Sequence, residues 1–340
     1  MTENRYIPTL DDVAREAGVS TATVSRCLNM PDRVLKKTRL RVLDVVETLG
    51  YTPNFGARAM AAKRTFTIGA IIPTMENAIF ARGLQAFQEE LHVLGYTLLV
   101  SSTAYRPDIE AEQIRSLVAR GADGLLLIGY DRDAALYDYL ERQGVPTLLA
   151  WAYKHDQPHA CVGFDNRASM EALACQVIDM GHREIAMISG VVEGNDRAAM
   201  RLAGVRDGLR AKGLDASAMT VIETPYEVEN GAKAFAQIMA GPNRPSAVMC
   251  GNDVLAVGAI QKAQDLGLRV PQDVSITGFD DIELARIVTP QLTTVHVPHR
   301  QMGQQAARAL IRMVEQGAPG GALELESSLR LRASLGARQP

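Results

Sequence analysis

From residue 66 to the C-terminus, short apolar runs alternate with stretches of helical spacing, and this alternation is the strongest constraint on the fold. Most of the apolar runs are near-continuous, which is typical of strands covered by helices on both faces. A strand–helix–strand series predicts parallel, doubly wound sheets, and about 270 residues of it favour two lobes. The predicted strands are Thr67–Pro73, Tyr96–Ser102, Gly124–Gly129, Pro146–Trp151, Glu184–Gly190, Ala247–Gly251 and Val274–Phe279.

Residues 9–50 predict a different, all-α head of three short helices. Either Ser20 or Thr21 can cap the second helix, and Gly50 ends the third. Each helix has apolar residues three or four positions apart, as a helix with one buried face requires. These residues are Leu10, Val13, Ala14 and Ala17 in the first helix, Val24 and Leu28 in the second, and Leu40, Leu43, Val46 and Leu49 in the third.

Charge is distributed unevenly along a chain whose net charge is only −3. Residues 1–64 carry 11 basic and 7 acidic side chains, a balance of +4, which leaves −7 for the rest. A basic head on an acidic body can approach a phosphate backbone with one end only. Aromatic residues make up 5% of the chain, which argues against a protein that stacks single-stranded bases.

The four cysteines form no Cys-x-x-Cys pair, so we expect buried, reduced thiols and neither a metal site nor a cofactor. Residues 1–10 lack the apolar region of a secretion signal, and no apolar run approaches the ~18 residues of a membrane helix. The sequence therefore predicts a cytoplasmic protein without a membrane partner. The cysteines are Cys27, Cys161, Cys175 and Cys250.

Residues 10–29 have the length, the glycine turn and the apolar contacts of a helix-turn-helix. Ala14 is small where two helices must cross, and Val19 and Val24 are placed to pack between them. The second helix would fit the major groove of double-stranded DNA, which is about 12 Å wide. Its Arg26 is able to donate two hydrogen bonds to guanine. The outward residues of this helix are Thr21, Ala22, Ser25 and Arg26.

Together with the segment Gly50-Tyr-Thr-Pro-Asn54, the residues Val13–Ser20 and Thr23–Arg26 resemble the LacI/GalR family of repressors. The resemblance continues in the same order through almost the whole chain. It implies a transcription regulator with a helix-turn-helix head and a two-lobed sensor body similar to periplasmic binding proteins. The further matching segments are Ile68–Pro73, Gly181–Ile185, Arg201–Gly204, Gly251–Asp253, Val270–Val274, Gly278–Asp281 and Leu292–Thr294.

The resemblance implies a homodimer whose heads read the two half-sites of operator DNA. It divides the chain into a DNA-binding domain at 1–52, a hinge helix and linker at 53–65, and an effector-binding and dimerisation domain at 66–340. In that domain, an N-lobe takes up about 66–162 and 296–325, and a C-lobe about 163–295 and 326–340. In the family, paired hinge helices enter the minor groove, and Met60 holds the position of a wedging leucine. The implied DNA contacts are Thr9, Thr21, Ala22, Thr23, Ser25, Arg26, Asn29, Tyr51, Asn54, Ala57 and Met60.

Two positions depart from the family pattern. Ala22 stands where a larger polar residue is common, and it offers only a methyl contact. Leu35 stands where a serine often caps the third helix, and the missing cap costs about 1 kcal/mol. The nearby Lys36, Lys37 and Arg39 are equally compatible with phosphate contacts and with a solvated face.

In the resembled family, a small molecule binds in the cleft between the lobes, at the carboxyl ends of the strands. Arginines can donate to hydroxyls or to a carboxylate, Asp280 can accept from hydroxyls, and Asn252 can do both. Aromatic side chains can cover the apolar faces of a ligand. The implied effector site consists of Phe80, Trp151, Arg197, Arg201, Tyr226, Asn252 and Asp280.

Four stretches are most similar to gluconate-utilisation repressors within the family. A sugar or a sugar acid such as gluconate is therefore the first candidate effector, since two arginines suit a carboxylate. The acidic pair Asp280–Asp281 favours a neutral polyol instead, and a purine or another corepressing metabolite is an alternative. The stretches are Pro73–Phe80, Tyr105–Glu110, Gly163–Asn166 and Asn195–Arg197.

The sequence lacks the enzyme signatures of doubly wound folds. It has no Gly-x-Gly-x-x-Gly turn after a strand, no phosphate loop, no nucleophile elbow and no His-Glu-x-x-His motif. We therefore expect a ligand-responsive repressor of a carbohydrate or sugar-acid catabolic operon, and not an enzyme. A sugar-binding protein without DNA switching and a constitutive nucleoid-type DNA binder are the remaining alternatives.

Overall fold

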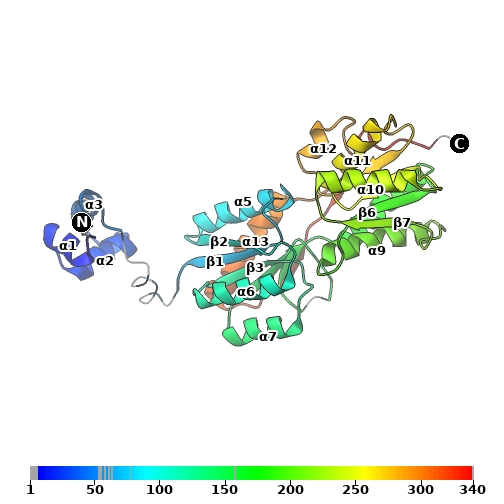
Figure 1. The fold of residues 1–340 in the computed structure, drawn as a ribbon. Helices are drawn as coiled ribbons and strands as arrows, with labels where there is room; N and C mark the ends of the chain where they lie inside the picture. Colours follow the sequence, from blue (N-terminus) through cyan, green and yellow to red (C-terminus); the bar gives the residue numbers. More distant parts are fainter. Residues whose placement is uncertain are drawn as a thin grey trace, which may run out of the picture. The chain divides into compact units, whose positions relative to one another are not determined.

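The computed structural model describes residues 7–52, 56, 59, 62, 64–76, 78–156 and 158–338. The chain divides into unit 1, Met1–Thr65, and unit 2, Phe66–Pro340. Figure 1 shows the fold of each unit as a ribbon. Unit 1 contains the helices α1 (Leu10–Glu16), α2 (Thr21–Asn29) and α3 (Lys36–Leu49), with a short 3-10 helix at Pro31–Arg33.

The three helices of unit 1 surround a small apolar core, but α3 turns a different face to it than the sequence predicts. Leu40 and Leu43 are 57% and 37% exposed, whereas Val42 is fully buried, and Val46 and Leu49 pack against the core. Spacings of three and four residues fit either stripe, so contact with α1 and α2 decides which one is buried. The core consists of Val13, Ala14, Ala17, Val24, Cys27, Val42 and Tyr51.

Unit 2 consists of two lobes, each a parallel sheet between helices. The first lobe contains β1 (Thr67–Ile72), α5 (Ala78–Val93), β2 (Thr97–Ser102), α6 (Pro107–Ala119), β3 (Gly124–Ile128), α7 (Ala134–Gln143), β4 (Thr147–Ala150), β5 (Cys161–Gly163), α13 (His299–Gln316) and β11 (Ala322–Glu324). The second contains α8 (Asn166–Asp179), β6 (Ile185–Gly190), α9 (Asp196–Ala211), β7 (Thr220–Thr224), α10 (Val228–Ala240), β8 (Ala247–Cys250), α11 (Asp253–Asp265), β9 (Ser275–Thr277) and α12 (Leu284–Ile287).

The first sheet has the strand order β11-β5-β4-β3-β1-β2, and the second has the order β7-β6-β8-β9. Neighbouring strands are parallel in both sheets. A separate antiparallel pair joins β10 (Thr294–His296) to β12 (Ser328–Arg330). These sheets and the helical unit 1 confirm the predicted fold class, an α/β body with doubly wound parallel sheets after an all-α head.

Helices cover both faces of the first sheet, as Figure 1 shows with α6 and α7 on one side and α5 on the other. Successive residues of β3 point to opposite faces, so Leu125 packs with the α6–α7 side, whereas Leu126 packs with the α5–α13 side. On the latter side, the backbones of α5 and α13 nearly touch. A Cβ at Gly303 would lie 2.0 Å from the carbonyl oxygen of Gly83, and a Cβ at Gly83 would lie 2.4 Å from the Trp151 ring, so neither position has room for a side chain.

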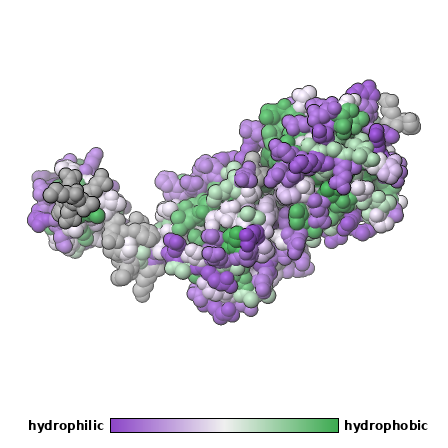
Figure 2. All heavy atoms as spheres, viewed as in Figure 1, coloured by the Kyte–Doolittle hydropathy of each residue, from purple (hydrophilic) through white to green (hydrophobic). Residues whose placement is uncertain are grey.

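All seven predicted strands are present, whereas β5, β7, β10, β11 and β12 were not predicted. Most of these are only three residues long, and β7 is a partly exposed edge strand. The edge strand β2 is also less covered than its apolar sequence suggests, with Leu99 39% and Val100 36% exposed. Figure 2 shows a largely hydrophilic surface interrupted by separate hydrophobic patches on unit 2. None of the helices in the described part of the chain is long and apolar enough to span a membrane.

Candidate functional sites

The corner between α1 and α2 depends on two capped helix starts. Thr9 and Asp12 cap α1 reciprocally, because each side chain accepts a hydrogen bond from the other residue's backbone N–H. Ser20 is the cap of α2, and its hydroxyl accepts from the backbone N–H of Thr23 at 3.2 Å. The caps fix where each helix begins and therefore which residues of α2 point outward.

Helix α2 has one buried face and one open face. Val24 and Cys27 are buried in the core of unit 1, whereas Arg26 is exposed on the other side. The Nε of Arg26 donates to the carbonyl of Ala22 at 3.2 Å, and its two terminal nitrogens have no partner within the described part of the chain. The predicted contacts on this face are the exposed Ala22, Arg26 and Asn29 and the half-buried Thr21, Thr23 and Ser25.

The other predicted DNA contacts are placed differently. Tyr51 is only 9% exposed and belongs to the core of unit 1, so its ring is not part of the open face of α2. Of the basic residues before and within α3, Lys36 and Lys37 are exposed and Arg39 is half-buried. Asn54, Ala57 and Met60 lie outside the described residues.

Arg201 of α9 lies at the centre of the predicted effector residues and is only 4% exposed. Its guanidinium donates to Asn166 Oδ1 at 2.9 Å, to the carbonyl of Gly251 at 2.8 Å and to Asp280 Oδ1 at 3.2 Å. It also lies 3.8 Å from the centre of the Phe279 ring. Three directional bonds and a cation–π contact therefore fix this side chain between α8 and the ends of β8 and β9.

Two polar atoms near Arg201 are buried and have no hydrogen-bond partner among the described residues. They are the Oδ2 of Asp280 and the Nδ2 of Asn252, both in fully buried residues. Burial raises the pKa of Asp280 to about 6, although Arg201 lowers it. An unpaired buried donor or acceptor is costly, and a ligand hydroxyl can satisfy both atoms because it donates and accepts.

Asp281 has partners of its own, so it and Asp280 do not act as an acidic pair. Its carboxylate accepts from Arg332 at 2.6 Å, pairs with His296 at 2.9 Å and approaches Arg286 at 3.5 Å. The prediction of a neutral polyol rested on two adjacent carboxylates, and one of these, Asp281, is already bound by other side chains.

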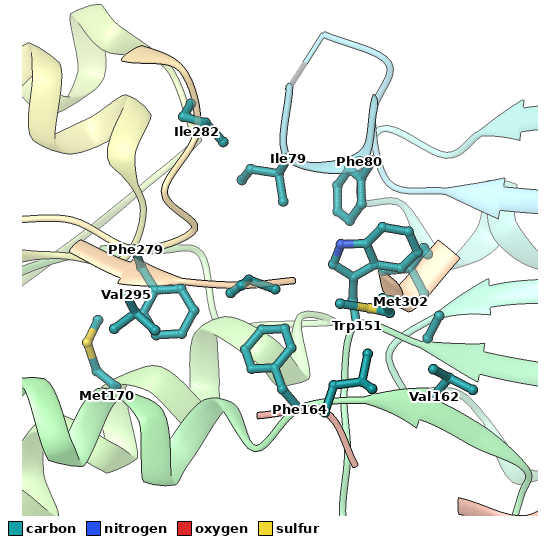
Figure 3. Close-up of a cluster of buried hydrophobic side chains, with 14 of the residues drawn as sticks. Ile79, Phe80, Trp151, Val162, Phe164, Met170, Phe279, Ile282, Val295 and Met302 are labelled. Carbon is teal, nitrogen blue, oxygen red and sulfur yellow. The ribbon is translucent and has the colours of Figure 1, made fainter. Parts of the chain in front are cut away.

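Phe80 and Trp151 lie next to each other in the cluster of buried hydrophobic side chains that Figure 3 shows. Their rings lie 5.6 Å apart at 65°, and the two residues are 4% and 1% exposed. The indole N–H of Trp151 donates to Nδ1 of His299 at 3.3 Å, and Nε2 of His299 donates to the carbonyl of Asp280 at 3.2 Å. Burial lowers the pKa of His299 to about 4, so the ring is neutral and carries its proton on Nε2.

A small cavity of about 30 Å³ lies between the lobes. Arg197 lines this cavity, and Tyr226 is half-buried with its ring 6.1 Å from that of Tyr105. Burial, and then Tyr226, raises the pKa of the Tyr105 hydroxyl. Other lining residues are Pro73, Thr103, Glu110, Ile128, Arg132 and Asp196.

The structure thus brings Phe80, Trp151, Arg201, Asn252 and Asp280 together, with Arg197 and Tyr226 beside them. The sequence prediction missed Tyr105, Asp196 and His299. A signal for the first two was present, since both fall in stretches that match gluconate-utilisation repressors. His299 falls in none of the matching segments.

The described residues contain no group of three or more His, Cys, Asp or Glu placed to hold a metal ion. All four cysteines are free thiols, three of them buried and Cys175 partly so. Burial raises the pKa of Cys161 and Cys250, which keeps these thiols protonated and unreactive.

Comparison with known proteins yields matches along the whole chain. Residues 9–54 match the bacterial regulatory proteins of the lacI family, and residues 174–335 match a periplasmic binding protein-like domain. The catabolite control protein A of Priestia megaterium is 33% identical over 91% of this chain and 93% of its own. The HTH-type transcriptional repressor PurR of Escherichia coli is 33% identical over 96% of both chains. The crystal structure of the Lac repressor dimer bound to operator and the anti-inducer ONPF superposes with a TM-score of 0.87 at 27% identity, over 98% of this chain and 100% of that one.

Proposed function

This chain belongs to the LacI family of bacterial regulatory proteins and is a DNA-binding transcriptional regulator; from that premise we propose that a small molecule in the cleft of unit 2 changes its affinity for operator DNA. The proposed domains are a DNA-binding head at 1–52, a hinge and linker at 53–65, and a sensor at 66–340. The chain passes from the N-lobe to the C-lobe near residue 162, returns to the N-lobe near residue 296, and passes to the C-lobe again near residue 325.

The open face of α2 is the proposed reading surface. Arg26 donates to guanine in the major groove, and Ala22 contacts a thymine methyl group. In this proposal Asn54, Ala57 and Met60 act in the minor groove, and Tyr51 supports the head from its core. The remaining proposed contacts are Thr9, Thr21, Thr23, Ser25 and Asn29.

One observation carries the proposed effector site: a buried acceptor of Asp280 and a buried donor of Asn252 have no hydrogen-bond partner in the described part of the chain, near an Arg201 that makes three hydrogen bonds. A hydroxyl-rich ligand supplies both missing bonds, while Phe80 and Trp151 cover its apolar faces. We therefore propose a sugar or a sugar acid such as gluconate. A carboxylate of that acid would be placed near Arg197, at the cavity between the lobes.

The proposed assembly is a homodimer in which two heads read two half-sites. The edge strand β2 supports this assembly, because its exposed Leu99 and Val100 form an apolar edge that a second copy can cover. Residues 53–65 form only a short connector, and a helix of that length is marginal in isolation. An effector that prefers one arrangement of the lobes can therefore change the fraction of molecules in which the connector helices form.

The test begins with thermal-shift measurements on the full chain with gluconate, neutral sugars and purines, because a bound ligand raises the melting temperature. Operator duplexes are selected from random sequence, and their Kd is measured with and without each hit. Arg201→Lys should lose at least about tenfold in effector affinity, because a lysine ammonium cannot reproduce the planar fork that reaches Asn166, Gly251 and Asp280 together. Arg206→Lys, an exposed change in the same helix, is the control. Failure to prefer any duplex over random sequence, with every compound supplied or withheld, would contradict the proposal.

A purine is the second candidate effector. The aromatic rings of Phe80, Trp151, Tyr105 and Tyr226 favour it, since they lie around the same polar centre and suit a flat heterocycle. A melting-temperature gain with guanine or hypoxanthine, and none with sugars or gluconate, would select this candidate.

A further inference from the structure

Asp196, the first residue of α9, joins the second lobe to the first. It is 5% exposed, and its Oδ2 accepts hydrogen bonds from the backbone N–H groups of Tyr130 and Asp131, the latter at 3.3 Å. Its Oδ1 accepts from Arg197 Nη1 at 2.7 Å and from the Arg197 backbone at 2.8 Å. Both oxygens of the carboxylate are therefore occupied, one by each lobe.

Arg197 adds a third bond between the lobes. Its Nη1 donates to the carbonyl oxygen of Ile128, the last residue of β3, at 3.2 Å. Ile128, Asp131, Asp196 and Arg197 all line the cavity between the lobes, so these bonds stand at its wall. The two residues thus hold the loop after β3 from the opposite lobe.

Gly129 lies between the atoms that these bonds connect, and a larger residue fits there only if the side chains of Asp196 and Arg197 move away. A Cβ at this position would lie 2.0 Å from Arg197 Nη1 and 2.4 Å from Asp196 Oδ1. The backbone φ of Gly129 is +75°, which side chains also disfavour. The close approach of the two charged side chains to this loop therefore depends on glycine.

The hydrogen bonds of Asp196 and Arg197 to the first lobe can break and re-form at little cost. Asp196 and Arg197 are charged groups that water solvates well, so separating the lobes replaces each lost bond with hydration. When the lobes are together, the three hydrogen bonds of Asp196 and Arg197 are shielded from water and form at one place. Arg201, by contrast, donates to three groups of its own lobe, whereas His299 and Asn166 also make bonds across the lobes.

We propose that Asp196 and Arg197 form a latch that holds the two lobes together at the wall of this cavity. The latch concerns regulation of the cleft described above, so its role in DNA control rests on the proposed function. Because an effector can enter only an open cleft, the fraction of molecules with an open latch sets its apparent affinity.

The test uses the full chain without DNA or effector. Gly129→Ala and Asp196→Ala should each break the latch, whereas Gly144→Ala is the matched control, since Gly144 has a φ of +63° and no atom within 4 Å of an added Cβ. Amide hydrogen exchange of the Tyr130–Asp131 loop should be at least about tenfold faster in both latch variants. Trp151, the single tryptophan and 1% exposed, reports on the lobes, and its quenching by acrylamide should increase about twofold or more. Circular dichroism checks that each variant is folded.

Three results would overturn the latch. One is wild-type exchange and quenching in both latch variants, and another is an equal change in Gly144→Ala. The third is faster loop exchange with unchanged quenching of Trp151, which would mean that Asp196 orders the loop without holding the lobes. All are measured on the free protein, so a failure of operator or effector binding is recorded separately and affects none of them.

Discussion

Arg26 is the residue to which we assign guanine recognition, because its terminal nitrogens are open on the exposed face of α2. Replacing it with alanine should lower specific operator affinity by about 1–3 kcal/mol and leave non-specific binding almost unchanged. Arg33→Ala is the control, since it removes the same charge from an exposed position outside α2. Gel-shift titrations at constant salt measure both. Equal losses on operator and random duplex would assign Arg26 to phosphate contact instead.

His299 makes the stability of unit 2 depend on pH. Its pKa falls from 6.5 to about 4 on folding, so between these values the unfolded chain binds a proton that the folded chain does not. Stability is therefore lost as the pH falls from 6.5 toward 4, by about 2 kcal/mol between pH 7 and pH 5. The raised pKa of Asp280, about 6, acts in the opposite direction over the same window.

His299→Gln separates the two effects, because it removes the histidine titration and leaves Asp280 in place. Urea unfolding at pH 7 and pH 5 should show the wild type losing about 2 kcal/mol more than the variant. Parallel losses in the two proteins would mean that the folded state does not hold His299 neutral.

Individual residues differed in how far the sequence could place them. Arg201, Asn252 and Asp280 follow strand ends in matching motifs, and the topology of a parallel sheet brings such ends together. Tyr51 was assigned to DNA by its motif, yet its ring is part of the unit 1 core, since a motif does not show which way a side chain points. His299 acts through contacts with residues 148 and 19 positions away, which no local pattern encodes.

At the scale of elements, helix α3 begins without a side-chain cap. Its N-cap is Leu35, 81% exposed and making no capping hydrogen bond. Leu35→Ser should therefore stabilise the start of α3 by about 1 kcal/mol, slowing amide exchange of its first turn about fivefold. Leu40→Ser, an exposed change inside the same helix, should not slow it. Equal effects of the two would point to lost surface hydrophobicity and not to capping.

Elements with a long, uniform pattern could be predicted, and short or edge elements could not. The central strands β1 and β3 are buried along their whole length, so their apolar runs identify them. By contrast, β5 has three residues, and β7 mixes polar and apolar side chains because one edge faces solvent. In α3 two stripes have the same spacing, and only tertiary contacts distinguish the buried Val42 from the exposed Leu40.

For the whole molecule, the prediction concerns assembly. If two copies meet along the β2 edge, Leu99→Lys places a charge in an apolar contact and should convert dimers to monomers. Operator affinity should then fall by at least about a hundredfold, because the two heads no longer bind as one unit. Leu266→Lys, at a 51% exposed leucine of the second lobe, is the control. Sedimentation velocity measures the mass, and an unchanged dimer in Leu99→Lys would place the interface elsewhere.

The chain order of unit 2 has a consequence for synthesis on the ribosome. Helix α13 and strand β11 complete the first lobe, although both are encoded after most of the second lobe. Until residues 299–324 emerge, α5 lacks the helix it packs against, and apolar surface stays available to chaperones. Unit 1 has been translated long before. A premature stop near residue 290 is therefore expected to yield a folded head with no working sensor, a product that cannot respond to metabolites.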